Sequence, residues 1–210
     1  MALFFVLFFP GTLALLNANP FMFPLENISY SLFWRFPACI LILLLLKKPL
    51  PFCPKKDLIT AALCLPVLCL TGILVSLAAA FSGFYPPHEI LPPEGIFPWI
   101  AVMLLSCSTG TLEELYFRIY LPIRILELKQ DTPNLAEKPI LPAFFSSAYL
   151  LPALLFAFCH AYQGPWAFVN ALLAAFILSI AYIKSRSFAG IAIAHSLYNI
   201  FVFLMASLKP

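Results

Sequence analysis

The sequence predicts an all-α fold, a polytopic bundle of seven to eight transmembrane helices, and three observations support this prediction. First, 63% of the 210 residues are hydrophobic and only 10% are charged, whereas soluble domains carry about 25% charged residues. Second, the apolar segments are long and continuous, which is typical of membrane helices and not of the alternating strands of a barrel. Third, the polar segments between them are short. We therefore expect residues 1–210 to form a single integral membrane domain with several passes, in the cell inner membrane if the source is a prokaryote.

The hydrophobic segments place seven candidate spans along the chain, and their lengths leave room for an eighth. We expect them at residues 2–16, 32–46, 58–81, 99–126, 143–162, 166–183 and 188–208. The first resembles a signal peptide but lacks a positively charged start, so we take it as a retained span. The fourth is longer than a bilayer requires, which predicts a tilted or protruding end.

Basic residues gather in the loops that follow the second, fourth and sixth spans. They are Lys47, Lys48, Lys55, Lys56, Arg124, Lys129, Lys138, Lys184 and Arg186. Because cytoplasmic loops carry an excess of Lys and Arg, these three loops are predicted to face the cytoplasm. The net charge of +3 therefore reflects membrane orientation. We expect the lipid bilayer as a partner and no nucleic acid, and the sequence predicts no oligomeric state.

Strongly polar residues are rare inside the predicted spans, and a charge at the bilayer centre costs at least ~2.5–3.5 kcal/mol. The set comprises Glu113, Glu114 and Arg118 in the fourth span, His160 in the fifth, and His195 with Asn199 in the seventh. Arg35 lies near the predicted start of the second span, so its side chain is expected to reach the membrane interface. Asn170 in the sixth span is expected to form a hydrogen bond between helices.

The spacing of these residues predicts which of them interact. Glu114 and Arg118 are four residues apart, so they share a helix face and can form an ion pair. Glu113 points about 100° away from Glu114 and is expected to face a cavity. Phe156 lies one turn before His160, where its ring can pack against the imidazole.

These residue types can hydrolyse a peptide bond. A carboxylate and a histidine can together deprotonate water, and a second histidine with an amide can stabilise the resulting oxyanion. Glu and His could instead hold Zn²⁺, although the HExxH spacing of helical zinc proteases is missing, so the residues alone leave both metal-free and metal-dependent hydrolysis open. A non-catalytic alternative also stays open. It is a transporter, or an immunity or scaffold protein that binds a membrane peptide, because intramembrane Glu and His also form proton relays.

Three short motifs occur in order on three apolar segments. They are EExxxR from Glu113 to Arg118, FxxxH from Phe156 to His160, and HxxxN from His195 to Asn199. In these motifs the chain resembles the CPBP intramembrane proteases, which include type II CAAX prenyl endopeptidases and Abi-like proteins for bacteriocin processing or self-immunity. The resemblance covers residues 106–200, and the motif-bearing core spans about residues 97–207.

The resemblance implies a glutamate-type endopeptidase without a metal, so we expect no metal and no other cofactor, with zinc as a minor alternative. Glu113 and His160 would activate the attacking water, Glu114 and Arg118 would support Glu113, and His195 with Asn199 would form the oxyanion hole. The implied substrate is a membrane-anchored protein or peptide that is cleaved near its C-terminus, with a CAAX-like or sorting signal.

Two positions depart from the family pattern, and one boundary conflicts with it. Ile119 follows the arginine where family members commonly have glycine, and Pro152 interrupts the segment before Phe156. At about 1.5 Å per residue, the predicted fifth span places His160 near the membrane face opposite to Glu113. We therefore expect this segment to be bent or re-entrant, so that the motif residues converge in one cavity open to the cytoplasm.

Overall fold

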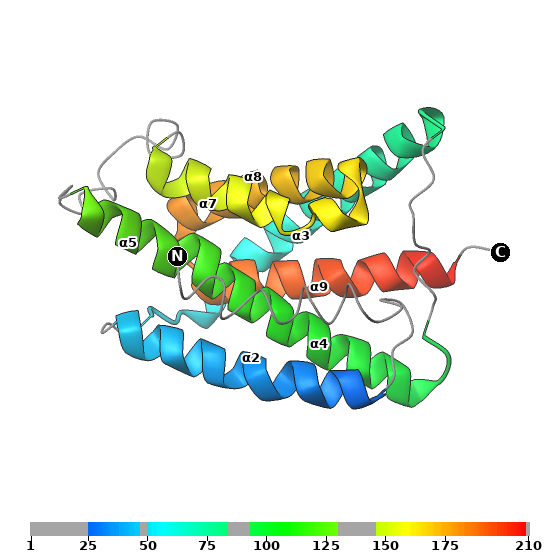
Figure 1. Ribbon diagram of the computed structural model, residues 1–210, viewed down its shortest axis with the longest axis horizontal. Coiled ribbons are helices and arrows are strands. Elements are labelled where there is room, and N and C mark those ends of the chain that lie inside the picture. The colour runs from blue at the N-terminus through cyan, green and yellow to red at the C-terminus, as the bar shows by residue number, and fades with distance from the viewer. Residues whose placement is uncertain (1–24, 47–49, 84–92, 130–145, 209–210) are drawn as a thin grey trace.

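The computed structural model describes residues 25–46, 50–83, 93–129 and 146–208. Within these ranges every regular element is helical (Figure 1). The elements are α2 (Leu25–Leu46), α3 (Pro54–Phe81), α4 (Ile96–Glu114), the π-helical η1 (Leu115–Tyr120), α5 (Leu121–Leu128), α7 (Ser147–Phe158), the 3₁₀ turn η3 (Ala161–Gln163), α8 (Pro165–Ser185) and α9 (Phe188–Ser207). The predicted all-α fold is confirmed.

Four helical runs in the described ranges are long and apolar enough to cross a membrane. They are Pro54–Phe81, Ile96–Leu128, Pro165–Ser185 and Phe188–Ser207, and α2 adds the shorter apolar stretch Trp34–Leu46. Their outer faces are also apolar: on α3, Leu63, Leu70 and Leu77 are 70%, 57% and 49% exposed. A helix that is apolar all round belongs in lipid or in a large core, so the chain is an integral membrane protein. The predicted first span lies outside the described residues.

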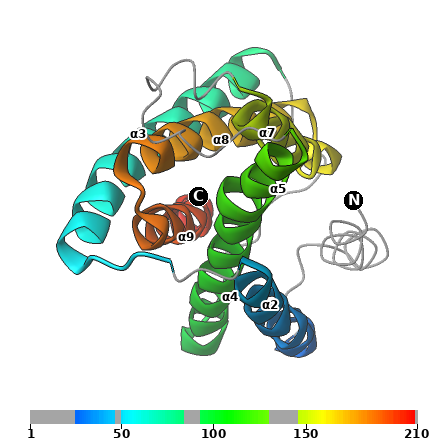
Figure 2. The same cartoon turned by 90° about the vertical axis from the view of Figure 1, so that its left-hand side faces the viewer.

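Helix α9 packs mainly between α4 and α3, with a smaller contact to α8, and its remaining face is exposed (Figure 2). Helix α2 packs on the outer side of α4, and α7 packs on α8. Gly110 allows the close approach of α4 and α9, because a Cβ atom there would lie 2.6 Å from Oγ and 3.0 Å from the backbone N of Ser196. Small residues at such crossings are typical of membrane helices. This crossing brings the first and third motifs together.

The helix ends that flank the three basic loops lie at one end of the bundle. Arg124 Nη2 donates to the Leu45 carbonyl at 2.7 Å, which joins α5 to the end of α2. Lys129 Nζ donates to Ser147 Oγ at 2.5 Å, which joins the end of α5 to the start of α7. The Ser187 hydroxyl, just before α9, donates to the buried carboxylate of Asp57 at the start of α3. We call this the basic end of the bundle; it is the end predicted to face the cytoplasm.

The run from Ile96 to Leu128 confirms a long fourth span, but its middle turn is a π-helix from Leu115 to Tyr120. Pro122 gives a physical reason for the wider turn. Proline has no N–H and its ring clashes with the carbonyl four residues earlier, which here belongs to Arg118. π turns are frequent at functional sites, and this one begins directly after Glu114.

The predicted fifth span is too long. Helix α7 has only 12 residues, or about 18 Å, against a hydrocarbon core of about 30 Å. Pro152 lies inside α7 without ending it. The helix ends instead in a turn at Cys159 and His160, which leads into η3 and to Gly164 with φ 107°. His160 is therefore not carried to the opposite membrane face, and the conflict with Glu113 disappears.

Candidate active site

Glu114 and Arg118 form the predicted ion pair at the junction of α4 and η1. Oε2 of Glu114 lies 3.1 Å from Nε of Arg118. The two residues are 0% and 1% exposed. Removing two charges from water is costly, and a well-formed pair repays that cost only in part. The pair therefore needs further partners, and α9 and α7 supply them.

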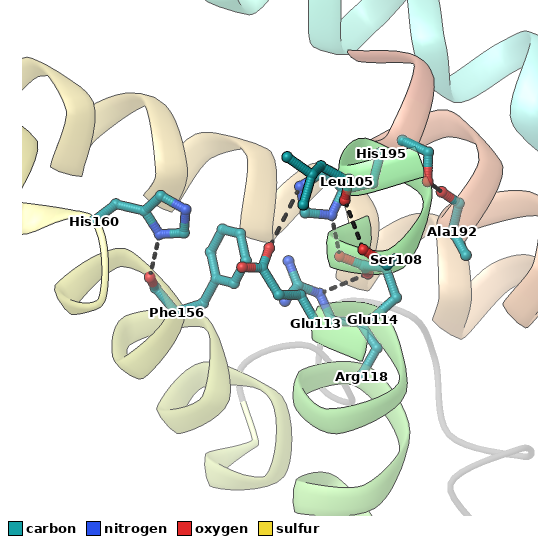
Figure 3. A network of polar contacts seen from close by, with 10 residues as sticks. Leu105, Ser108, Glu113, Glu114, Arg118, Phe156, His160, Ala192 and His195 are labelled. Atoms are coloured by element: carbon teal, nitrogen blue, oxygen red, sulfur yellow. Dashed lines mark hydrogen bonds and ion pairs between the residues drawn. The ribbon is translucent and has the colours of Figure 1, made fainter. Parts of the chain in front are cut away.

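His195 of α9 connects to both carboxylates. Its Nδ1 lies 2.8 Å from Oε1 of Glu114, and its Nε2 lies 3.6 Å from Oε2 of Glu113. An ionised carboxylate only accepts hydrogen bonds, so Nδ1 carries a hydrogen and donates a hydrogen bond to Glu114. The contact to Glu113 is longer than a hydrogen bond and acts through charge. Figure 3 shows the resulting chain of contacts from Glu113 through His195 and Glu114 to Arg118, which we call the Glu–His network.

Phe156 joins the second motif to the Glu–His network. Its ring centroid is 4.7 Å from that of His160 and 5.9 Å from that of His195. The guanidinium carbon of Arg118 lies 4.5 Å from the same ring centroid, a cation–π contact. The predicted packing of Phe156 on His160 is confirmed, and one buried phenyl ring holds side chains of all three motifs.

His160 lies on the α7 side of the Phe156 ring, and Glu113 and His195 lie on the side of α4 and α9 (Figure 3). Nδ1 of His160 is 2.9 Å from the Phe156 carbonyl oxygen. A carbonyl only accepts, so Nδ1 donates and Nε2 is left with its lone pair. No hydrogen bond or ion pair joins His160 to Glu113 within the described ranges. The His160 side chain is half-buried, which leaves Nε2 available to a water molecule.

Asn199 follows His195 by one turn on α9 and is half-buried. In the part of the chain that the structure describes, its amide makes no hydrogen bond. The structure therefore brings Glu113, Glu114, Arg118, Phe156 and His195 into contact and places His160 against the Phe156 ring. Asn199 lies one helical turn from His195, and no hydrogen bond joins it to this group among the described residues.

A sequence model of a protease family, described as Rce1-like type II CAAX prenyl endopeptidase, matches residues 95–201. This match contains all three motifs. The chain belongs to this family. Membership confirms the resemblance that the motifs predicted. No curated protein and no solved structure matches the chain.

Arg35 is the residue near this Rce1-like site that the sequence analysis misplaced. Helix α2 begins at Leu25 and not at residue 32, so Arg35 lies inside the helix. Its Nη1 is buried and has no hydrogen-bond partner among the described residues. It also lies close enough to Glu113 for their charges to interact. The prediction that Arg35 reaches the interface is wrong. Arg35 lies inside an apolar stretch, as Arg118 does, and this pattern could have indicated that its side chain is directed toward the site.

Tyr162 and Cys159 also lie within electrostatic range of Glu113, whose side chain is 15% exposed. Glu113 is thus the less buried of the two carboxylates and the one without a hydrogen bond in the described ranges. In the same ranges, no group of three His, Cys, Asp or Glu residues is placed to hold a metal ion. The metal-free mechanism stays a prediction and is tested below.

Proposed function

We propose that this chain is an intramembrane endopeptidase that cleaves a membrane-anchored protein or peptide near its C-terminus, with Glu113 as the general base. The observation that carries the proposal is the position of His195 between the two carboxylates. One carboxylate is buried and fixed by Arg118, and the other is partly exposed and held only by a long contact. In this proposal the buried Glu114 orients His195, and the partly exposed Glu113 transfers the proton.

In the proposed reaction, Glu113 accepts a proton from water, and the water oxygen attacks the carbonyl carbon of the scissile peptide bond. His160 assists through Nε2, which accepts a hydrogen bond from the same water. The negative charge that develops on the carbonyl oxygen is stabilised by N–H groups of His195 and Asn199. Glu113 then passes its proton to the departing amine nitrogen, and the peptide bond breaks.

Glu114 and Arg118 act on His195 in this mechanism. The family resemblance assigned them to the support of Glu113, but the short contact of Glu114 is to His195 Nδ1 at 2.8 Å. This contact fixes the orientation of the imidazole. The oxyanion role requires a proton on Nε2 as well as on Nδ1 of His195, and Arg118 and Arg35 are further positive charges near the two carboxylates. The weak contact from Nε2 to Glu113 can then be exchanged for the substrate oxygen.

The proposed substrate is a protein held in the membrane by a prenyl group or by a hydrophobic sorting tail. The family description supports the first type, a CAAX prenyl substrate. The site lies about midway along the run from Ile96 to Leu128, which is about 50 Å long at 1.5 Å per residue, so it lies within bilayer depth. A polypeptide delivered through lipid reaches this depth more easily than a soluble one.

The test is processing in cells with the wild type, Glu113→Gln and the control Glu127→Gln. Glu127 lies on the same helical run, is exposed and, among the described residues, forms an ion pair only with Arg124. Each form is co-expressed with CAAX-terminated and tail-anchored reporters, and fragment masses are followed. We expect a cut fragment with the wild type and with Glu127→Gln, and a loss of about 10²–10⁴-fold with Glu113→Gln.

Two outcomes contradict the proposal. Equal cleavage by Glu113→Gln at equal folded levels removes Glu113 from the mechanism. Absence of any cleavage by the folded wild type favours a binding or transport protein. Treatment of the purified enzyme with a chelator is expected to leave cleavage unchanged, and loss of activity with a stoichiometric zinc ion would replace the metal-free mechanism.

A further inference from the structure

An open pocket of about 150 Å³ lies beside the Glu–His network, toward the basic end of the bundle. Three elements contribute to its lining. They are the η1–α5 run with Arg118, Ile123 and Leu126, α7 with Tyr149, and the end of α8 with Tyr182 and Arg186. Tyr149 precedes Phe156 by seven residues, or about 10 Å along α7. The pocket is therefore separate from the space around Glu113 and His160, and it shares only Arg118 with the network.

The lining of the pocket is positively charged and has no acidic residue. Arg186 forms no ion pair with any described residue, and its guanidinium carbon lies 6.0 Å from the Tyr182 ring centroid. Below the surface, Nη1 and Nη2 of Arg118 are buried and lack a hydrogen-bond partner among the described residues. The two tyrosines bring phenol groups to the same pocket. These features match an anion that carries several acceptor oxygens.

The rest of the lining is apolar, and two of these residues reach the surface. Ile123 is 38% exposed on the surface of α5, and Leu126 lies one turn further toward the basic end. Basic pockets between membrane helices on the cytoplasmic side bind anionic headgroups, and tyrosines gather at that depth. Neither Glu113, His160 nor Phe156 lines this pocket, so a peptide held at those residues does not occupy it. The observations therefore favour a lipid over the C-terminal end of a substrate.

We propose that this pocket binds the phosphate headgroup of an anionic phospholipid. Arg186, Tyr149 and Tyr182 contact the phosphate, the charge of Arg118 attracts it, and an acyl chain lies against Ile123 and Leu126. Because Arg118 also holds Glu114, a bound lipid stabilises the Glu–His network. This proposal concerns binding and does not require the chain to be a protease.

The test uses the purified chain in neutral phosphatidylcholine nanodiscs, with phosphatidylglycerol added in steps. Thermal unfolding and native mass spectrometry measure binding for the wild type, Arg186→Gln and Lys184→Gln. Lys184 is the matched control, because it is a basic residue two positions away that is exposed and does not line the pocket. We expect the wild type and Lys184→Gln to be stabilised alike and to retain one phosphatidylglycerol. Arg186→Gln should bind it about tenfold more weakly, because it loses a charge-assisted hydrogen bond to the phosphate that Lys184 does not make.

Three results overturn the proposal. Equal responses of all three forms to phosphatidylglycerol exclude Arg186 as a ligand. Equal stabilisation by inorganic phosphate at the same concentration shows that a soluble anion, and not a lipid, is the ligand. Stabilisation by a tripeptide with a free carboxylate but not by phosphatidylglycerol assigns the pocket to the end of a peptide. None of these readouts depends on cleavage, so failure here leaves the proposed protease function untouched.

Discussion

The two histidines of the site have contrasting surroundings. His195 is 5% exposed, lies inside the long helix α9 and is held by Glu114 at 2.8 Å. His160 is half-buried, lies in the turn after the short helix α7 and, among the described residues, forms a hydrogen bond only to the Phe156 carbonyl one turn earlier. One histidine thus belongs to a closed network of charges, and the other lies at an open edge of the same cluster.

Because of this difference, substitutions around His195 should lower the free energy of unfolding, whereas substitution of His160 should mainly lower the rate of cleavage. Groups in a closed buried network depend on one another, so the loss of one leaves an uncompensated charge. A half-buried group with one local hydrogen bond can be replaced at small cost to the fold, even where it takes part in the chemistry. Substitutions at the two sides should therefore produce different combinations of unfolding and activity changes.

The largest effect is expected for Arg118→Met. This change leaves the carboxylate of Glu114 buried without its cation, so we expect a loss of about 3–5 kcal/mol in the free energy of unfolding. Cleavage should be lost as well, because Arg118 fixes Glu114 and Glu114 in turn orients His195. Thermal unfolding in detergent, followed by helical circular dichroism, measures the first effect.

The double variant Glu114→Gln with Arg118→Met is the control for this prediction. It removes both charges, so it should recover part of the lost stability but not the activity. If Arg118→Met is as stable as the wild type, the closed network does not exist as described.

His160→Gln is expected to reduce cleavage by about 10²–10⁴-fold, the range for the loss of an acid–base group. The free energy of unfolding should change by about 1 kcal/mol or less, because the side chain is half-buried and bonds only to the Phe156 carbonyl. Cleavage rates in liposomes and unfolding in detergent are compared on the same preparation. A large loss in the free energy of unfolding would show that the fold depends on His160 as it does on His195, which would contradict the proposed difference between the two histidines.

The smallest effect is expected for Tyr198→Phe, where α9 contacts α3 and α8. Its hydroxyl exchanges hydrogen bonds with the Asn170 side chain, at 2.9 and 3.2 Å. Loss of these bonds should cost about 1 kcal/mol in the free energy of unfolding, with cleavage unchanged at a temperature where the protein is folded. Reduced cleavage by a stable variant would show that this face of α9 also takes part in the reaction.

The local parts of this site could be predicted from the sequence. The pair of Glu114 and Arg118 and the packing of Phe156 on His160 follow from a spacing of four residues on a helix. The bond of Asn170 to another helix follows from the rarity of amides in apolar spans. The later long spans were also predictable, because a run of about 20 apolar residues is needed to cross a bilayer.

The other features depend on tertiary packing. Apolar residues suit a full span and a buried half-span equally, so hydropathy could not show that α7 ends at Phe158. The contact of His195 with both carboxylates depends on the close crossing of α4 and α9 at Gly110, which spacing within one helix does not reveal. The π turn and the inward position of Arg35 each had a cue in the sequence, Pro122 and an arginine in an apolar stretch.

The most direct test of the central claim compares single-turnover cleavage by the wild type and Glu113→Gln in the same liposomes. The substrate is a farnesylated peptide that ends in a CAAX sequence, and the solvent contains ¹⁸O-labelled water. We predict that the wild type releases the C-terminal tripeptide and places one ¹⁸O atom in the new carboxylate, and that Glu113→Gln does so at least about 10²-fold more slowly at equal folded amount. Cleavage at the same rate by both forms would contradict the assignment of Glu113 as the base.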